Sequence, residues 1–421
     1  MKATIFPSTC KGSIKIPPSK SMAHRSIICA SLANGKSVIS NVAYSDDIKV
    51  TIEGMKNLGA NITCFKDSIE IVGIKNFQHL KNSTIFCKES GSTLRFFIPI
   101  FSLCNQVLTF TGENRLLKRP QRIYEDIFKS QNISYIQDDN KIEIGGSLKS
   151  GHYELDGNVS SQFISGLLFA LPLLKEDSTI HIKEPYESRS YVDLTLQMLE
   201  LFGIQATYKD TNTLYIKGGQ SYKPNNYTIE GDFSQAGFYC VLACINNDLT
   251  LTGLNPNSKQ GDKQIIDIIK DFGINVIENK DGYTICKGVL TPKGIDLQNC
   301  PDLGPILCVL MALTSGKSQI YNALRLRYKE SDRIKAMDDE LKKCGVDIHS
   351  TQAEIMVNGN PPYTCTDELN GHKDHRIVMS LAILATILKQ PVTINDAQYI
   401  NKSYPSFFDD LKTIGIEVTY G

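Results

Sequence analysis

The sequence has no net charge, no apolar run of membrane length and no closely paired cysteines, and each absence excludes a class of function. Lysine and arginine number 45, as do aspartate and glutamate, so no overall basic field is available for nucleic acid or an anionic membrane. The longest apolar runs, such as Ile377–Leu388, hold about twelve residues, too few to span a bilayer. Met1–Gly12 lacks the long apolar core of a signal peptide. We therefore expect a cytoplasmic protein that binds neither nucleic acid nor membrane.

The 12 cysteines are scattered along the chain, and no two of them form a Cys-x-x-Cys pair. Several, such as Cys240 and Cys308, lie within apolar helical stretches. A free thiol behaves there as a small hydrophobic group. The pattern indicates a protein that is kept reduced.

A short strand pattern recurs six times along the 421 residues, a length that suits two or three domains. Successive copies end about 70 positions apart, a spacing that indicates an internal repeat. After each strand the pattern predicts an amphipathic helix and then a pair of strands. The helix ends near a glycine, which suits a left-handed cap, in every copy except the second, where Gln131-Asn132 stands at the equivalent place. The expected first strands are Val38–Asn41, Thr109–Gly112, Ile180–Lys183, Thr250–Gly253, Gln319–Asn322 and Thr393–Asp396.

Between the copies lies a second kind of helix, apolar on all sides and therefore expected to be buried. Each of these helices begins with polar residues. Capping alone explains a serine or aspartate at one helix start, but six such starts predict that the free N–H groups converge on a common cleft. The expected helices are Ala23–Leu32, Leu94–Leu103, Phe163–Leu174, Ala236–Ile245, Leu303–Leu313 and Ile377–Leu388.

The sixth copy lacks one strand, because only Glu417–Tyr420 follows its helix. We expect Lys2–Phe6 at the N-terminus to supply the missing partner, so that the chain crosses twice between two lobes. The sequence therefore predicts an α/β fold of six repeated units, three per lobe. Residues 1–19 and 230–421 form one expected lobe, and residues 20–229 form the other.

The stretch Arg325–Arg333 combines four cations with Glu330 and Asp332, and a helical periodicity follows it. Backbone N–H groups at the start of a helix favour anions. Further cations stand at matching places in the copies. Charged hydrogen bonds contribute about 1.5–3 kcal/mol each, and several are needed to offset the desolvation of a phosphate, so the set suits one or two multiply charged small anions. These further cations are Lys20, Arg25, Arg95, Arg119, Arg376 and Lys402.

Asp302 and Glu330 are the carboxylates that share their segments with these cations. Two interpretations stay open for them. They are either ion-pair partners of the cations or a pair of groups that transfers protons. The position of Asp302 behind Pro301 also predicts that it caps a buried helix.

Three weaker patterns carry no function in this interpretation. His372 and His375 are three residues apart but have no recognisable third ligand, so we expect no metal site and interpret His375 as structural. Thr314–Ser318 resembles the end of a phosphate-binding loop but lacks its earlier glycine. The thiols, Cys87 included, lack a histidine partner for nucleophilic catalysis.

Five segments together carry a pattern that one family shares. They are Pro18–Ser21 with Arg25, Ser160–Phe163, Lys329–Arg333, Asp374–Arg376 and Lys402–Pro405. In this order, and over nearly the whole chain, they resemble the signature segments of the 5-enolpyruvylshikimate-3-phosphate synthase family. The resemblance implies the inside-out α/β fold of enolpyruvyl transferases, with two lobes of three units closing over substrate. It also implies transfer of the enolpyruvyl group of phosphoenolpyruvate to the 5-hydroxyl of shikimate-3-phosphate, with release of phosphate and without a metal or organic cofactor.

The resemblance also assigns roles to single residues. Asp302 would accept the hydroxyl proton, while Glu330 and Lys20 would transfer protons at the methylene carbon. The residues expected to bind shikimate-3-phosphate are Lys20, Ser21, Arg25, Ser160, Ser161, Gln162, Ser188, Tyr191, Asp302 and Lys329. The residues expected to bind phosphoenolpyruvate are Lys20, Gly91, Arg119, Gln162, Arg333, Arg376 and Lys402.

The chain departs from the family pattern at three places. The usual Asn-Ala-Gly-Thr is replaced by Glu89–Ser92, and Phe96 replaces the proline that often follows Arg95. Both changes border the expected phosphoenolpyruvate pocket, so sensitivity to the family's inhibitor glyphosate does not carry over. Arg325 stands where many relatives have a small amide, so the substrate contact of that amide does not carry over to this chain.

Two other functions compete with this interpretation. The sister enzyme that transfers enolpyruvyl to UDP-N-acetylglucosamine shares the fold and the donor, but it lacks the Lys-Glu-Ser-Asp-Arg and Ser-Ser-Gln segments. A non-catalytic repeat scaffold that binds a phosphorylated ligand would not require Asp302 and Glu330 together. Nothing in the sequence demands an oligomer, so a monomer is expected.

Overall fold

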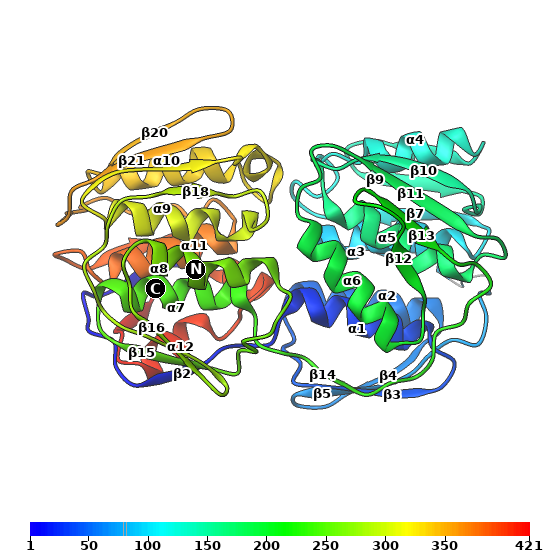
Figure 1. The fold of residues 1–421 in the computed structure, drawn as a ribbon, viewed down its shortest axis with the longest axis horizontal. Coiled ribbons are helices and arrows are strands. Elements are labelled where there is room, and N and C mark those ends of the chain that lie inside the picture. The colour runs from blue at the N-terminus through cyan, green and yellow to red at the C-terminus, as the bar shows by residue number, and fades with distance from the viewer. Residues whose placement is uncertain (79, 81) are drawn as a thin grey trace. The chain divides into compact units, whose positions relative to one another are not determined.

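Two compact units make up the chain (Figure 1). Each unit has its own hydrophobic core. The computed structural model describes residues 1–78, residue 80 and residues 82–421. Unit 1 combines Met1–Ser19 with Glu230–Gly421, and unit 2 is Lys20–Ile229. The described residues of each unit form three sheets and a matching set of helices, so the same architecture occurs twice.

Unit 2 has three four-stranded sheets of one topology, in which a parallel pair of strands is extended by two antiparallel pairings. Buried and less buried side chains alternate along the strands, as in β11, where Ile180 and Ile182 are fully buried. The strand orders are β14-β3-β5-β4, β6-β7-β9-β8 and β10-β11-β13-β12. The strands are β3 (Lys36–Ser40), β4 (Asn61–Cys64), β5 (Ser68–Val72), β6 (Thr84–Phe86), β7 (Val107–Thr111), β8 (Ser134–Gln137), β9 (Lys141–Gly145), β10 (His152–Asp156), β11 (Ser178–Lys183), β12 (Ala206–Tyr208), β13 (Thr213–Ile216) and β14 (Tyr227–Thr228).

Unit 1 repeats this topology in the sheets β16-β17-β15-β2 and β18-β19-β21-β20. Its third sheet has the order β22-β1-β23 and is antiparallel. The strands are β1 (Ala3–Ile5), β2 (Ser13–Lys15), β15 (Leu249–Thr252), β16 (Val276–Asn279), β17 (Gly282–Ile285), β18 (Gly294–Asp296), β19 (Gly316–Tyr321), β20 (Asp347–Ser350), β21 (Ile355–Gly359), β22 (Val392–Ile394) and β23 (Val418–Tyr420). The six predicted first strands are confirmed as β3, β7, β11, β15, β19 and β22.

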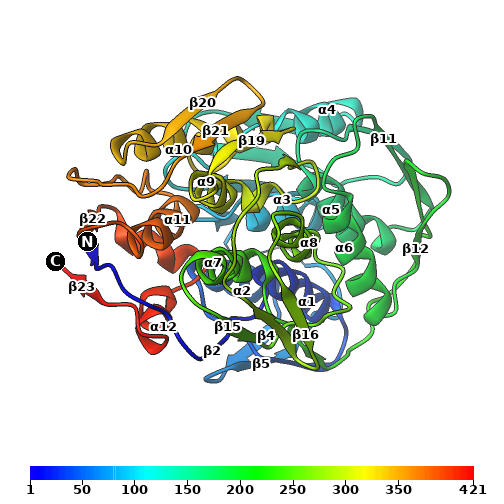
Figure 2. The same cartoon turned by 60° about the vertical axis from the view of Figure 1, so that its left-hand side comes forward.

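The N-terminal strand completes the last copy of the repeat. In β1, Thr4 lies opposite Thr393 of β22 and Thr419 of β23, so the two chain ends meet at this sheet (Figure 2). The predicted pairing of the N-terminal strand is therefore confirmed. Strand β2, which joins β15, was not predicted.

Six helices are buried on nearly all sides, as predicted from their continuous apolar character. They form the interior of each unit, and the strands of the sheets pack their buried side chains into the same two cores. Several polar residues at the helix starts are buried as well, such as Ser90 and Asp374, whereas Lys20 remains partly exposed. The buried helices are α1 (Lys20–Leu32), α3 (Gly91–Ser102), α5 (Ser161–Ala170), α7 (Phe233–Ile245), α9 (Gly304–Ala312) and α11 (His375–Ala385).

A second set of helices follows the first strands of the copies, and in α2 the apolar face is formed by Ile48, Ile52 and Met55. This helix ends at Gly59 with a φ of 115°, a left-handed conformation that glycine adopts without strain. The helices are α2 (Asp46–Leu58), α4 (Arg122–Ser130), α6 (Arg189–Leu201), α8 (Gln264–Asp271), α10 (Arg333–Lys343) and α12 (Phe407–Thr413). Short 3-10 turns are η1 (Leu171–Leu173), η2 (Gly261–Lys263), η3 (Pro301–Leu303), η4 (Leu324–Tyr328) and η5 (Ala397–Lys402). None of the described helices combines the length and apolarity that a membrane span requires.

Candidate active site

In unit 1 the charged residues gather around Arg333, the first residue of α10. Its side chain is only 1% exposed and contacts three carboxylates. The guanidinium lies 2.8 Å from Asp374 through Nε, 2.8 Å from Glu330 through Nη2 and 3.2 Å from Asp302 through Nη1. Burial opposes its charge, but the three carboxylates outweigh burial and raise the pKa of Arg333 above its ordinary value. This arginine is therefore a fixed cation around which the other groups are arranged.

Asp302 is the carboxylate with the most cations around it. One of its oxygens lies 3.1 Å from Lys329 Nζ and 3.2 Å from Arg333 Nη1, and the other lies 3.1 Å from Arg376 Nη2. Burial alone would raise its pKa, but Arg376, Lys329 and Arg333 hold the pKa of Asp302 well below its usual range. With 24% of its side chain exposed, the carboxylate is ionised and still accessible.

The prediction that Asp302 caps a buried helix is wrong. Asp302 lies in the 3-10 turn η3, and α9 begins only at Gly304, with Leu303 at its cap position. Pro301 is the first residue of this turn, where its fixed φ and missing N–H are tolerated. The carboxylate of Asp302 is directed to the three cations instead of a backbone N–H. Its contacts are thus those of a site residue.

Glu330 and Asp374 bind the same guanidinium in different ways. Asp374 is fully buried, receives a hydrogen bond from Ser331, and caps α11 by accepting from the backbone N–H of Arg376. Glu330 is 14% exposed and also lies 3.9 Å from Lys402 Nζ. Asp374 is therefore a fixed structural anchor, whereas Glu330 is the more accessible of the two carboxylates.

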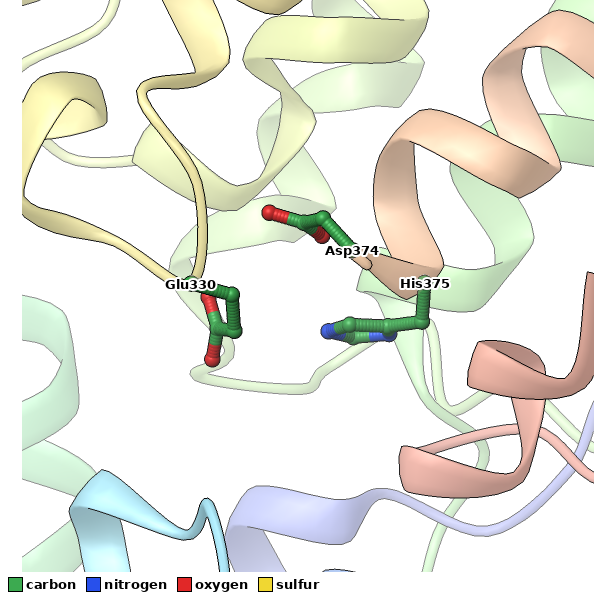
Figure 3. A group of neighbouring side chains, drawn as sticks. All are labelled: Glu330, Asp374 and His375. Atoms are coloured by element: carbon green, nitrogen blue, oxygen red, sulfur yellow. The ribbon is translucent and has the colours of Figure 1, made fainter. Parts of the chain in front are cut away.

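His375 lies beside these carboxylates, with one ring nitrogen directed toward Glu330 (Figure 3). One ligand atom each of Glu330, Asp374 and His375 fall within 4.8 Å of one another. A divalent ion fits this group poorly, because the guanidinium of Arg333 already bonds to both carboxylates. The other ring nitrogen of His375 contacts the hydroxyl of Ser403, so the histidine is part of the charged group although the sequence interpretation gave it only a structural role.

In unit 2 a buried arginine has neutral partners. Arg25 is 3% exposed and donates to the Thr195 hydroxyl at 2.8 Å and to the backbone carbonyls of Ser21 and Tyr191 at 2.8 and 2.9 Å. It also lies over the ring of Phe96, 5.4 Å from the ring centroid. Burial without a carboxylate lowers the pKa of Arg25 to about 10. The predicted ligands Ser21, Arg25 and Tyr191 are thus brought together.

Lys20 starts α1 and forms an ion pair with Asp47 at 2.8 Å. The lysine side chain is 18% exposed and that of Asp47 is 6% exposed. Asp47 was not predicted as part of the site. The only sequence signal for it was its place at the start of the helix α2, which by itself indicates capping or a favourable charge.

Gln162 is held by two neighbours on different elements. Its amide oxygen accepts from Arg95 at 2.7 Å, and its amide nitrogen donates to Ser92 at 3.0 Å. The helix start below it is capped by Ser160, which accepts from the Gln162 backbone N–H. Ser161 follows as the first residue of α5. The Ser-Ser-Gln segment therefore projects one amide with a fixed orientation.

Gly91 allows Arg119 to approach the start of α3. A Cβ added at Gly91 would lie 2.8 Å from Arg119 Nη1, closer than side chains normally allow. The predicted ligands Gly91 and Arg119 are therefore in direct contact, and glycine is needed there for close approach.

The departures from the family pattern have structural roles. Ser90 caps α3 by accepting from the Thr93 backbone N–H at 3.2 Å and from the Thr93 hydroxyl at 2.8 Å. Phe96 packs under Arg25, and Arg325 donates to the Gln298 carbonyl at 2.6 Å. Ser188, the remaining predicted ligand, is buried at the start of α6 with a φ of 53°.

Comparison with known proteins identifies what the chain resembles. Residues 6–411 match the family model described as EPSP synthase (3-phosphoshikimate 1-carboxyvinyltransferase). The 3-phosphoshikimate 1-carboxyvinyltransferase of Clostridium perfringens is 46% identical, with 98% of each chain covered, and that of Clostridioides difficile is 42% identical, with 98% of this chain and 97% of the relative covered.

Two solved structures share the fold over the whole chain. EPSP synthase from Acinetobacter baumannii matches with a TM-score of 0.81 at 25% identity, with 100% of both chains covered. The enolpyruvyl transferase NikO from Streptomyces tendae matches with a TM-score of 0.80 at 14% identity, covering 100% of this chain and 98% of NikO. The predicted fold of the enolpyruvyl transferases is confirmed.

Proposed function

The chain belongs to the EPSP synthase family. We propose that its residues carry out that family's reaction, and that the two units contribute different groups to it. The activity is 3-phosphoshikimate 1-carboxyvinyl transfer in the shikimate pathway, in which the enolpyruvyl group of phosphoenolpyruvate passes to the 5-hydroxyl of shikimate-3-phosphate and phosphate leaves. Both substrates are anions, which suits the buried cations of both units.

Most of the groups for shikimate-3-phosphate come from unit 2. Arg25 supports this assignment, because its charge is solvated by a hydroxyl and two carbonyls and remains available for an anion. Hydroxyls and amides around it supply further hydrogen bonds. The proposed ligands are Lys20, Ser21, Arg25, Ser160, Ser161, Gln162, Ser188 and Tyr191 of unit 2, with Asp302 and Lys329 of unit 1.

Phosphoenolpyruvate carries a phosphate and a carboxylate, which require several cations. Arg333 and Arg376 already share Asp302, so a substrate anion would compete for guanidinium groups that point to one place. Gly91 leaves room for Arg119 beside the start of α3. The proposed ligands are Lys20, Gly91, Arg119, Gln162, Arg333, Arg376 and Lys402.

The chemical steps need one group that gives a proton and one that takes a proton. Glu330, with Lys20, would protonate the methylene carbon of phosphoenolpyruvate, which makes the adjacent carbon electrophilic. The 5-hydroxyl then attacks that carbon, and Asp302 takes the hydroxyl proton. Loss of a methyl proton and of phosphate completes the transfer, so the electrons balance without a redox cofactor or metal.

The observation that carries the proposal is that Asp302 and Glu330 share Arg333. In its present contacts Asp302 is a weak base, because three cations hold its pKa low. A substrate anion that draws Arg333 and Arg376 toward itself reduces this effect, and the pKa of Asp302 then rises toward a useful range. Binding of the donor and activation of the base are coupled in this way.

We further propose that the two compact units are the domains of a monomeric, cytoplasmic enzyme. The buried thiols support a reducing compartment, because 10 of the 12 free cysteines are buried and disulfides persist mainly outside the cytosol.

A coupled assay of phosphate release tests the proposal directly. Purified protein with phosphoenolpyruvate and shikimate-3-phosphate should release phosphate, and omission of either substrate should abolish release. Release with UDP-N-acetylglucosamine in place of shikimate-3-phosphate would assign the sister activity, and binding of both anions without any release would indicate a scaffold.

A further inference from the structure

A carboxylate two helical turns beyond Arg333 holds the loop that leads into α11. Glu340 lies on α10 and its side chain is 2% exposed. One of its oxygens accepts from the backbone N–H of Asn370 at 2.8 Å, and the other lies 2.8 Å from His372 Nε2. Lys343 adds an ion pair at 2.7 Å from the surface side. A buried carboxylate on α10 therefore holds this loop.

The held loop, Asn370–Lys373, has an uncommon backbone. His372 and Lys373 both have left-handed conformations, with φ of 51° and 54°, which residues with side chains seldom adopt in succession. Such conformations persist only where the surroundings fix them. Glu340 fixes the loop on one side, and on the other Asp396 accepts from the Lys373 backbone N–H at 3.0 Å.

The loop has little freedom on its inner side as well. A Cβ added at Gly371 would lie 2.5 Å from Val378 and 2.6 Å from the Asn395 carbonyl. The Gly371 carbonyl accepts from the backbone N–H of Asp374 at 2.9 Å. A displacement of the loop therefore passes directly to Asp374.

Asp374 connects the loop to the charged group of unit 1. Its carboxylate bonds to Arg333 through two nitrogens at 2.8 and 3.2 Å, and it caps the helix that begins with His375 and Arg376. Glu340 and Arg333 are seven residues apart on α10, so they lie on the same face of that helix. Helix and loop thus form a closed circuit through Glu340, Asp374 and Arg333.

Burial alone would raise the pKa of Glu340, but the hydrogen bonds from His372, Lys343 and the Asn370 backbone outweigh burial and lower it. Glu340 therefore stays ionised at neutral pH and keeps all three partners. The charge that holds the loop is thus present under the conditions in which the enzyme works.

We infer that Glu340 is a positioning residue for the donor half of the site: through His372 and the loop Asn370–Lys373 it sets Asp374, and through Asp374 it sets Arg333 and Arg376. The inference rests on the proposed assignment of both arginines to phosphoenolpyruvate. Of the groups assigned to shikimate-3-phosphate, only Asp302 contacts these two arginines among the described residues, so the larger effect falls on the donor.

Four variants of the full-length enzyme test the inference. Glu340→Ala removes the whole contact, His372→Ala removes the imidazole arm, and Lys343→Ala removes only the surface ion pair and is the matched control. Glu340→Gln is the conservative variant, because its amide oxygen can accept from Asn370 while its nitrogen donates to the other tautomer of His372. The measurements are KM for each substrate, kcat, the affinity for phosphoenolpyruvate by calorimetry, and the melting temperature.

The first two variants should raise KM for phosphoenolpyruvate by roughly 10- to 100-fold, since displacements of about 1 Å have effects of that order. KM for shikimate-3-phosphate should change far less, Lys343→Ala should match the wild type, and Glu340→Gln should recover most of the loss. Weaker calorimetric binding of phosphoenolpyruvate should accompany the higher KM, and this readout does not depend on turnover.

An equal rise of both KM values together with a lower melting temperature would overturn the inference, because a purely structural role predicts it. Unchanged KM for phosphoenolpyruvate in His372→Ala would also overturn it, whether or not Glu340→Ala folds. Absence of turnover in the wild type would contradict the proposed function instead, and the calorimetric comparison of His372→Ala with Lys343→Ala would still decide the role of Glu340.

Discussion

Two buried arginines, one in each unit, have opposite surroundings. Arg333 in unit 1 contacts Asp302, Glu330 and Asp374, whereas Arg25 in unit 2 contacts a hydroxyl and two backbone carbonyls. The carboxylates raise the pKa of Arg333, while burial lowers the pKa of Arg25 to about 10. Among the residues that the structure describes, no carboxylate contacts Arg25.

The different partners of Arg25 and Arg333 suit them to different tasks, substrate binding and proton transfer. A cation among neutral dipoles keeps its attraction for an anion, because nothing of opposite charge has to be displaced. A cation shared by several carboxylates instead couples anion binding to the protonation of those carboxylates. We therefore assign mainly binding to Arg25 and its neighbours and proton transfer to the group around Arg333.

The largest expected effect comes from the carboxylates of unit 1. Asp302→Asn and Glu330→Gln keep the shape of the side chains but remove the ability to exchange a proton. Each should lower kcat by roughly two to four orders of magnitude, the usual range for general acid–base groups. Steady-state phosphate release at saturating substrates measures kcat. If the carboxylates only balance charge, turnover persists in both variants and anions bind equally well or better.

Arg25 gives the contrasting result in unit 2. Arg25→Lys keeps the charge but cannot reach Thr195 and both carbonyls together, because an ammonium is a point donor. We expect the affinity for shikimate-3-phosphate to fall by roughly 10- to 100-fold, as for the loss of one charged hydrogen bond, with kcat within a few fold of the wild type. Calorimetric titration with shikimate-3-phosphate checks this. A loss of kcat with unchanged affinity would contradict the division between the units.

Another buried carboxylate in unit 1 gives a comparison that depends on pH. Asp262 is buried, receives a hydrogen bond from Ser234, and has a pKa raised to about 6, first by burial and then by the charge of Asp302. A raised carboxyl pKa means that folding favours the protonated form, so this stabilising contribution is present at low pH and is lost as the pH rises from about 4 through 6.

Asparagine stays neutral at every pH, so Asp262→Asn should keep the stability that the wild type loses when Asp262 ionises. The free energy of unfolding at pH 7.5 should therefore rise by about 1–3 kcal/mol relative to the wild type, with no gain near pH 4. Denaturant titrations at both pH values measure the difference. The exposed Asp271→Asn is the control and should show no such change with pH. A gain that is equal at both pH values would show that Asp262 does not titrate in this range.

The smallest effect is expected at Gly91. A methyl group there would lie 2.8 Å from Arg119, and the end of the arginine side chain can shift to relieve the clash. Gly91→Ala should therefore raise KM for phosphoenolpyruvate by about tenfold, equivalent to about 1.4 kcal/mol, and leave the affinity for shikimate-3-phosphate unchanged. Steady-state kinetics with each substrate varied in turn will show the selectivity, and an equal change for both substrates would contradict it.

Much of the fold could be predicted because it follows from local patterns. The six strands and six buried helices have apolar patterns that repeat along the chain, and the pairing of β1 with β23 followed from counting the strands of the last copy. Strand β2 could not be found in the same way, because it is three residues long and has only one buried side chain, Ile14.

The site was predicted less completely, for a physical reason. The segments that carry Lys20, Lys329 and Arg376 could be found from residue types in sequence order, and Asp302 could be named as a candidate ion-pair partner, but other partners could not. Asp47 and Glu340 become site or positioning residues only through contacts with elements distant in the sequence. The helix-cap interpretation of Asp302 failed because local sequence cannot show that three cations from other segments face the carboxylate.

The most direct test of the central claim compares Glu330→Gln and Arg25→Lys in one experiment. For each variant, calorimetry gives the affinity for shikimate-3-phosphate, and phosphate release with both substrates at saturation gives kcat. We expect opposite results for the two variants: Glu330→Gln loses kcat and keeps its affinity for shikimate-3-phosphate, whereas Arg25→Lys loses that affinity and keeps its kcat. Parallel losses of both quantities in the two variants would contradict a division between binding and proton transfer.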